Sequence, residues 1–265
     1  MKPQISVEAM MEAGMHFGHQ TFRHNPKMDQ YIFGVKSGIH IIDLTKTEPL
    51  LEAALEFISQ MVAEGKSVIL VGTKRQAASI VKEQAERARM PYVQNRWLGG
   101  ILTNFDTVSK RLAHLRQLDE RFKKNDFVGV TKKEKVLLDR EYKSLISSVG
   151  GLQELRTLPG AIFAVDMLKD AIAVREAHKL GIPVVAIVDT NANPDLADYP
   201  IPANDDARKA IEYVVKLVAD ACLAKPRGAA RVARESAEAE IPATPATDEV
   251  AIEDPKVKIG EEEGV

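Results

Sequence analysis

Apolar residues along most of the chain follow two alternating patterns: short continuous runs, and longer stretches with an apolar residue every three or four positions. The run 67–71 is closed by Gly72, as expected of a strand buried on both faces of a parallel sheet. The stretch before it has Leu51, Leu55 and Ile58 at helical spacing. The patterns predict strands at 39–44, 67–71, 162–165 and 184–188, and helices at 45–63, 74–89, 167–180 and 205–223.

Strands that alternate with helices of this length are typical of right-handed βαβ units. A doubly wound parallel sheet with helices on both faces is therefore expected, in the α/β fold class.

The stretch 103–150 interrupts this alternation. It carries two apolar stripes at helical spacing, with no strand between them and a polar turn at 123–135. Two consecutive helices of this kind are expected to pair as a coiled-coil-like α-helical hairpin inserted into the α/β domain. The hairpin contains eleven Lys or Arg residues and seven Asp or Glu residues, so it is basic.

The two ends of the chain differ from its middle. Residues 1–38 are predicted to form a short helix at 7–13 and then an ordered loop. Residues 226–265 are rich in Ala, Glu, Pro and Thr, and are predicted to be a disordered acidic tail. The α/β domain is then expected to consist of 39–102 and 151–225, with the hairpin 103–150 between its halves.

Composition and charge narrow the functional classes. The single cysteine, Cys222, excludes an intramolecular disulfide framework and a multi-cysteine zinc site; it is interpreted as a core residue. No signal-peptide-like apolar segment and no uninterrupted apolar stretch of membrane-spanning length is present, so a cytoplasmic protein is expected. The tail carries five basic and ten acidic residues, which leaves a net charge of +3 on residues 1–225 beneath an overall charge of -2. This permits nucleic-acid binding without demonstrating it.

The segment after the strand 67–71 is a candidate phosphate site. Thr73, Lys74 and Arg75 would lie at the N-terminus of a helix, where free N–H groups favour anions. The segment matches neither a Walker loop nor a dinucleotide fingerprint, so a backbone phosphate of RNA suits it better than a nucleotide. The alternative is an ordinary turn in which Thr73 caps the helix.

His16, His19 and His24 lie close together in the N-terminal segment, where phenylalanines, Arg23 and Lys27 alternate with them. Such a mixture favours an RNA-contacting loop, although a purely structural loop explains it as well. The H-x-x-H spacing of His16 and His19 can also bind a metal, but no other feature of the sequence resembles a zinc-binding motif.

Several carboxylates follow predicted strands, namely Asp43, Asp166 and Asp189, while Asp205 opens the last predicted helix. Because ligands bind at the carboxyl ends of the strands in such sheets, these side chains are candidates to converge there. Three interpretations remain: Asp189, Asn193 and Asp205 hold a divalent ion, the acids catalyse, or they only cap helices and form turns.

The only tryptophan, Trp97, lies beside Arg96 and a Gly-Gly bend, just before the hairpin. A lone tryptophan of this kind is expected to anchor the insertion to the sheet. Arg96 and Asn104 remain candidates to face a partner.

Taken together, several motifs resemble the bacterial small-subunit ribosomal protein S2 family. They are GMHFGH at 14–19, NPKM at 25–28, YIFG at 31–34, IDL at 42–44, GTK at 72–74, RWLGGILTN at 96–104 and GIPVVAIVDTN at 181–191. The resemblance covers about Val7 to Ala224 in the family's order.

This resemblance implies a flavodoxin-like three-layer α/β/α domain that is a structural part of the ribosome and has no catalytic site. It implies binding to small-subunit (16S) rRNA, contacts with neighbouring ribosomal proteins including S1, and no membrane, small-molecule substrate or required cofactor. By motif, the candidate rRNA-contacting residues are His16, His19, Arg23, Lys27, Lys74, Arg75, Arg96 and Asn104.

Two functions from other classes remain as alternatives. One is a phosphate-handling or receiver-like enzyme that uses Asp43, Asp166 and Asp189 around a metal, although Asp43 lacks the adjacent acidic residue usual in such sites. The other is a protein scaffold in which the hairpin binds another helix and RNA contact is incidental.

Overall fold

The computed structural model describes residues 5–125, 127 and 131–224. Its centre is a five-stranded, entirely parallel sheet in the order β5-β4-β6-β7-β8. These strands are β4 Val68–Val71, β5 Tyr92–Val93, β6 Ala161–Ala164, β7 Val184–Val188 and β8 Tyr199–Pro202. Counted along the chain from β4, their order is 2-1-3-4-5, which is consistent with the predicted flavodoxin-like fold.

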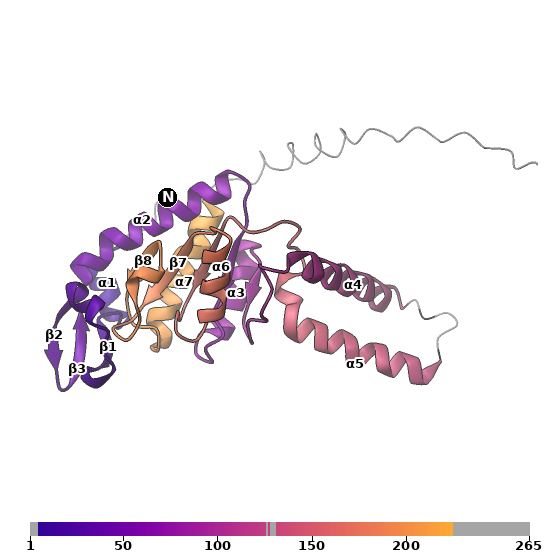
Figure 1. The fold of residues 1–265 in the computed structure, drawn as a ribbon, viewed down its shortest axis with the longest axis horizontal. Coiled ribbons are helices and arrows are strands. Elements are labelled where there is room, and N and C mark those ends of the chain that lie inside the picture. The colour runs from indigo at the N-terminus through magenta and orange to yellow at the C-terminus, as the bar shows by residue number, and fades with distance from the viewer. Residues whose placement is uncertain (1–4, 126, 128–130, 225–265) are drawn as a thin grey trace, which may run out of the picture.

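Helices cover both faces of this sheet (Figure 1). They are α1 Val7–Glu12, α2 Leu44–Ala63, α3 Ala78–Ala88, α4 Phe105–Lys124, α5 Lys132–Val149, α6 Ala171–Lys179 and α7 Arg208–Leu223, and the short 3-10 helices are Thr21–Arg23, Pro26–Tyr31, Gly150–Leu152 and Pro194–Leu196. Alternate strand residues point to opposite faces. Leu70 and Phe163 pack in the core with α2, α3 and α7, whereas Ile69 and Ile162 pack in a second core with α6 and the base of α4. Within the described residues, no helix has both the length and the apolar character needed to cross a membrane.

A second, three-stranded antiparallel sheet replaces the loop expected in the N-terminal segment. Its order is β1-β3-β2, formed by β1 Phe17–Gln20, β2 Ile32–Lys36 and β3 Ile39–Ile42. Ser37 and Gly38 both have positive φ, at 53° and 77°, and make a two-residue hairpin turn between β2 and β3. The prediction that 39–44 joins the parallel sheet is wrong, because β1 and β2 occupy both edges of β3.

The small sheet packs against the carboxyl edge of the parallel sheet. A Cβ added to Gly18 would lie 2.6 Å from Cγ2 of Thr190, so only glycine allows this approach. The backbone N–H of His19 donates to Oγ1 of Thr190 at 2.9 Å, and that of Asn25 donates to the carbonyl of Thr190 at 2.8 Å. This contact brings His19 to the ends of β7 and β8.

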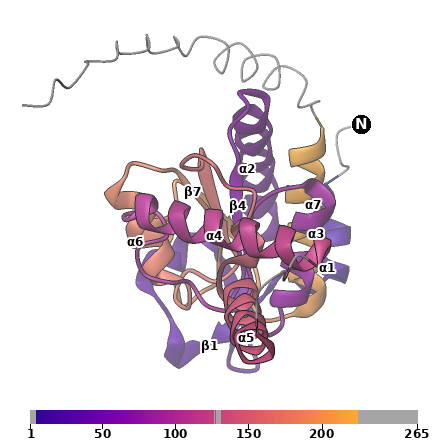
Figure 2. The ribbon, with the colours of Figure 1, turned by 90° about the vertical axis from the view of Figure 1, so that its right-hand side faces the viewer.

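Both helices predicted in the stretch 103–150 are present. They are joined by a hydrogen bond from Tyr142 to Asp119 and by stacking of the Phe122 and Tyr142 rings, whose centroids are 4.7 Å apart. Thr131 and Glu134 form a capping box at the start of α5. Figures 1 and 2 show α4 and α5 extending from one side of the body and crossing obliquely. Lengthwise coiled-coil pairing therefore stays a prediction, and the predicted tail 226–265 lies outside the described residues.

Candidate functional site

Charged side chains from three loops meet at the carboxyl edge of the parallel sheet. The ammonium group of Lys74, which follows β4, lies 3.2 Å from Asp166, 2.8 Å from Asp205 and 2.7 Å from Asp206. Asp166 follows β6, and the two other aspartates follow β8. The expectation that carboxylates after the strands converge is confirmed for Asp166 and Asp205.

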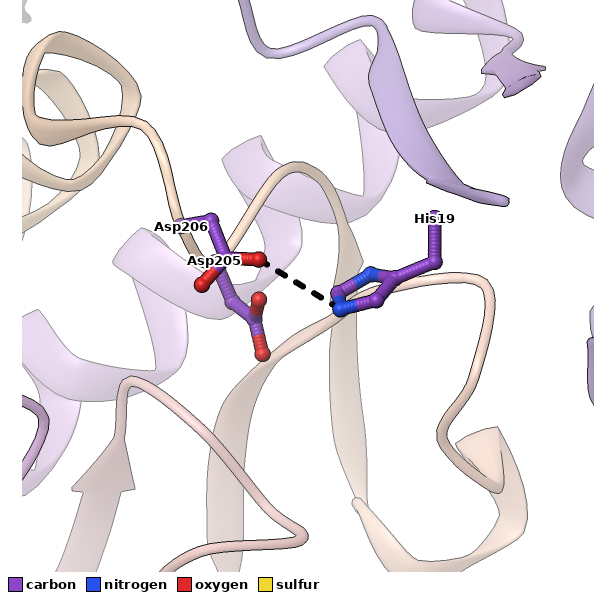
Figure 3. Close-up of side chains that lie close together, drawn as sticks. All are labelled: His19, Asp205 and Asp206. Atoms are coloured by element: carbon purple, nitrogen blue, oxygen red, sulfur yellow. Dashed lines mark ion pairs between the residues drawn. The ribbon is translucent and has the colours of Figure 1, made fainter. Parts of the chain in front are cut away.

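His19 extends this cluster from the small sheet. Its Nδ1 lies 3.0 Å from a carboxylate oxygen of Asp189, which is only 1% exposed, and its Nε2 lies 3.4 Å from Asp206. Figure 3 shows the imidazole pointing toward Asp205 and Asp206. One ligand atom from each of these three residues lies within 4.8 Å of the others, so together they can hold a metal ion. We call His19, Lys74, Asp166, Asp189, Asp205 and Asp206 the edge cluster.

Burial and like charges make this cluster electrostatically unusual. Burial, followed by repulsion from Asp189 and Asp166, raises the pKa of Asp205 to about 7. The hydrogen bond to Asp189 raises the pKa of His19 above its ordinary value, against the effect of burial. Burial would lower the pKa of Lys74, but the surrounding carboxylates outweigh it and raise that pKa, so Lys74 stays charged.

Two residues assigned to acidic sites by sequence lie elsewhere. Asn193 caps a 3-10 helix, where its side-chain oxygen accepts the N–H of Asp195 at 3.2 Å. Asp43 caps α2 and accepts hydrogen bonds from Thr45. The structure does not place Asp43 in the edge cluster, which removes one of the three acids that the receiver-like interpretation requires.

The capping interpretation of the acids is correct only in part. Asp43 is a helix cap, and Asp166 accepts the N–H groups of Leu168 and Lys169 in a turn. Asp205 does not cap α7: that helix begins after Ala207 without a side-chain cap, and Asp205 accepts from Lys74 instead.

The phosphate site predicted after β4 rested on a helix that would begin at residue 74. The helix α3 begins only at Ala78, so Thr73 is not the residue that caps it. The hydroxyl of Thr73 instead donates a hydrogen bond to Asp170 at 2.7 Å. Burial raises the pKa of Asp170 to about 6. Because Lys74 is held by carboxylates, Arg75 is the cation of this loop that stays exposed.

The remaining candidate RNA contacts fall in two regions. His16, Arg23 and Lys27 belong to the small sheet and its loops, and Lys27 is ion-paired with Asp195. The guanidinium of Arg23 lies 5.6 Å from the centre of the Phe22 ring. Arg96 and Asn104 are exposed near the start of α4, where Asn104 is the residue before the helix.

Two exposed apolar residues of β2, Phe33 and Val35, were not singled out from the sequence. Phe33 is 79% exposed and Val35 is 57% exposed. Phe22, which was expected in an RNA-contacting loop, lies in the 3-10 helix Thr21–Arg23 and is 76% exposed. Phe33 and Val35 are two residues apart on one strand and so lie on the same face, and adjoining exposed apolar side chains can mark a surface that contacts a partner. Their presence in a segment predicted to be a loop concealed them, because only strand geometry shows which residues turn outward.

Glu176 of α6 is a second residue that sequence reasoning missed. Its buried carboxylate accepts hydrogen bonds from the indole of Trp97, the N–H groups of Gly100 and Leu102, and both the N–H and the hydroxyl of Thr103. Burial alone would raise the pKa of Glu176, but the hydrogen bonds from these donors outweigh burial, so the pKa lies below its ordinary value. The prediction that Trp97 anchors the insertion to the sheet is confirmed, since it is 4% exposed in the second core, which contains residues of both the parallel sheet and α4.

Comparison with known proteins gives consistent matches over most of the chain. A model of the family described as "Ribosomal protein S2" matches residues 10–224. The chain is 51% identical over 243 residues to "Small ribosomal subunit protein uS2" of Bifidobacterium longum (strain DJO10A), covering 89% of this chain and 85% of that protein. It is 48% identical over 249 residues to the protein of the same name from Mesorhizobium japonicum, with 93% and 95% covered.

Proposed function

Because the chain belongs to the ribosomal protein S2 family, we propose that it binds small-subunit rRNA within the ribosome and helps to dock ribosomal protein S1. Its relatives are named as small-subunit ribosomal proteins, a structural family, so the chain is a ribosomal protein and not an enzyme. The family match over 10–224 carries the proposal. Its partners are 16S rRNA and neighbouring ribosomal proteins in the cytoplasm, without a membrane or a small-molecule substrate.

Three exposed guanidinium groups suit the binding of RNA phosphates. Within the described residues, no carboxylate forms an ion pair with Arg23, Arg75 or Arg96. Arginine and phosphate form strong paired hydrogen bonds, and each neutralised phosphate releases counterions. Of the other candidate contacts, His16, Lys27 and Asn104 would position the protein rather than read bases. Lys74 and His19 are already engaged by the carboxylates of the edge cluster, so they would act on rRNA only through the loops that they hold in place.

Binding to rRNA should weaken steeply as salt increases. For the purified chain and small-subunit rRNA, replacing Arg23, Arg75 and Arg96 together with Ala should reduce the slope of log affinity against log salt by about 1 for each phosphate that is no longer neutralised. The control is Lys82→Ala, since Lys82 already has a weak partner in Glu86 at 4.0 Å. Filter binding between about 50 and 200 mM salt measures both slopes. Affinity that stays constant over this range would contradict the electrostatic mechanism.

Docking of S1 is the part of the proposal that concerns a protein partner. Among the described surfaces, the apolar side chains of Phe33 and Val35 suit such a contact, because they are exposed on an edge strand of the small sheet. Retention of S1 can be measured on purified small subunits prepared with and without this chain. Small subunits that lack this chain but keep S1 in full would refute this part alone.

We further propose that the edge cluster holds a structural divalent ion. His19 Nε2 and the carboxylates of Asp205 and Asp206 would be the ligands, in place of the set with Asn193 expected from sequence. The buried carboxylate of Asp189 binds Nδ1 and so leaves Nε2 for the metal, which is the usual arrangement behind a metal-bound histidine. One imidazole with two carboxylates suits Zn²⁺ better than Mg²⁺. The edge cluster also contains four carboxylates but only one ammonium group, that of Lys74, and this excess of acidic groups favours an added cation.

Zinc should bind the purified full-length chain and raise its melting temperature at pH 8. His19→Gln should reduce the affinity at least tenfold, because it removes the nitrogen ligand. His114→Gln is the matched control, since His114 is paired with Glu141 on the hairpin. Isothermal titration calorimetry measures both affinities. Equal affinities for His19→Gln and the unaltered chain would refute the site.

A further inference from the structure

The hairpin carries a pocket that the proposed function does not use. It has a volume of about 420 Å³ and is lined by Phe122 of α4 and by Lys132, Lys135, Val136 and Asp139 of α5. Its lining residues come from the C-terminal turn of α4 and the first turns of α5. The pocket is therefore separate from the edge cluster and from the exposed residues of the small sheet.

The apolar part of this pocket is accessible from outside. Val136 is 51% exposed and its neighbour Leu137 is 53% exposed. Phe122 is stacked on Tyr142 and touches Phe127 edge-on, with ring centroids 5.0 Å apart. One face of Phe122 is thus already covered by Tyr142, and the other apolar residue of the lining, Val136, is aliphatic. Such a surface suits an aliphatic side chain better than the flat face of a nucleobase, which prefers an open aromatic plane.

The rim of the pocket is positively charged. Asp139 is neutralised by Lys143 at 2.7 Å. Glu134 keeps its negative charge, but it forms the capping box with Thr131 and does not line the pocket. Lys132 and Lys135 form no ion pair with any described residue; Lys135 only contacts the Asn125 side chain and lies 4.4 Å from the Phe127 ring centre. Among the described residues that line the pocket, the unbalanced charge is therefore cationic, and its complement is acidic.

We propose that this pocket binds an acidic segment of a neighbouring small-subunit protein. An aliphatic side chain of that segment enters between Phe122 and Val136, and its carboxylates meet Lys132 and Lys135. The inference rests on the proposed function, because the partner is taken to be part of the same ribosomal subunit. RNA is the competing occupant, and it is disfavoured because phosphates need cations but gain nothing from an aliphatic pocket.

Photo-crosslinking in the assembled subunit tests this. A photoreactive phenylalanine derivative is placed at Leu137 in the full-length chain, small subunits are purified by sedimentation, and the products of irradiation are identified by mass spectrometry. The control places the same group at Leu168, which is also 53% exposed but lies outside the hairpin. We expect a crosslink from position 137, and not from 168, to a ribosomal-protein peptide rich in Asp and Glu. When the photoreactive group at position 137 is combined with Lys132→Glu and Lys135→Glu, the yield of this crosslink should fall at least fivefold.

The outcomes separate this inference from the proposed function. If the chain is absent from the small-subunit fraction, the proposed function fails. If it is present but position 137 reacts only with rRNA, with a peptide that is not acidic, or with nothing, this inference alone is refuted. An unchanged yield in the charge-reversed chain refutes it as well, because the two lysines are exposed and their replacement leaves the core intact.

Discussion

Replacing Glu176 with Gln should lower the free energy of unfolding by about 3 kcal/mol. The reason is that each hydrogen bond to a charged acceptor contributes about 1.5–3 kcal/mol to stability, and the amide of Gln cannot accept all of them. Glu176 is 8% exposed, and its carboxylate accepts hydrogen bonds from Trp97, Gly100, Leu102 and Thr103. An amide keeps one acceptor oxygen but turns an NH₂ group toward the remaining N–H donors. The backbone at 100–103 would then lose its anchor to α6, and the start of α4 would be less firmly placed.

Urea unfolding measures this loss, and amide hydrogen exchange at Gly100, Leu102 and Thr103 locates it. Glu212→Gln is the matched control, because Glu212 is an exposed carboxylate on the helix α7. The role of Glu176 would be disproved by a stability equal to that of the control. It would also be disproved by a destabilisation without faster exchange at these three amides, because that pattern would mean a general packing defect.

Replacing Lys74 with Met should be nearly as damaging at pH 8. It removes the cation that lies between Asp166, Asp205 and Asp206, and breaking a buried ion pair costs about 3–5 kcal/mol. Asp206 is half exposed, so water screens part of this loss, and about 2–3 kcal/mol is expected.

The loss of stability caused by Lys74→Met should become smaller as the pH falls. The pKa of Asp205 is raised to about 7 in the folded chain, above its value in the unfolded chain. The folded state therefore binds a proton more readily, and the stability that this proton contributes is lost as the pH rises through about 7. Neutral Asp205 needs no cation, so Lys74→Met should be closer to the unaltered chain at pH 5 than at pH 8. Urea unfolding with a chelator present, with Lys82→Met as control, measures this; a pH-independent deficit would contradict it.

The parallel sheet was predictable because its central strands are buried on both faces. Such strands must be continuous apolar runs, and 67–71, 162–165 and 184–188 contain β4, most of β6 and β7. The edge strands β5 and β8 were missed. β5 has two residues, and β8 contains two prolines, which an edge strand tolerates but which conceal it in a sequence.

The candidate site was predictable only in outline. Parallel strands end at one edge, so carboxylates that follow them had to come near one another, as Asp166 and Asp205 do. The contribution of His19 depends on the antiparallel sheet that positions it. The sequence pattern predicted a loop in this segment and so did not reveal that sheet. Glu176 looks like an ordinary charged residue on an amphipathic helix, and only the fold shows that it faces five donors.

By itself the sequence determined the alternation of buried strands and helices, the two helices of the insertion and, through its motifs, the family. These depend on local periodicity and on residue identity. Only the tertiary structure decided that β3 joins β1 and β2, that Lys74 is held by acids rather than open to phosphate, and that Glu176 anchors the base of the hairpin. The reason is physical: strand pairing and the partners of a buried charge are set by residues far apart in the chain, which become neighbours only when it folds.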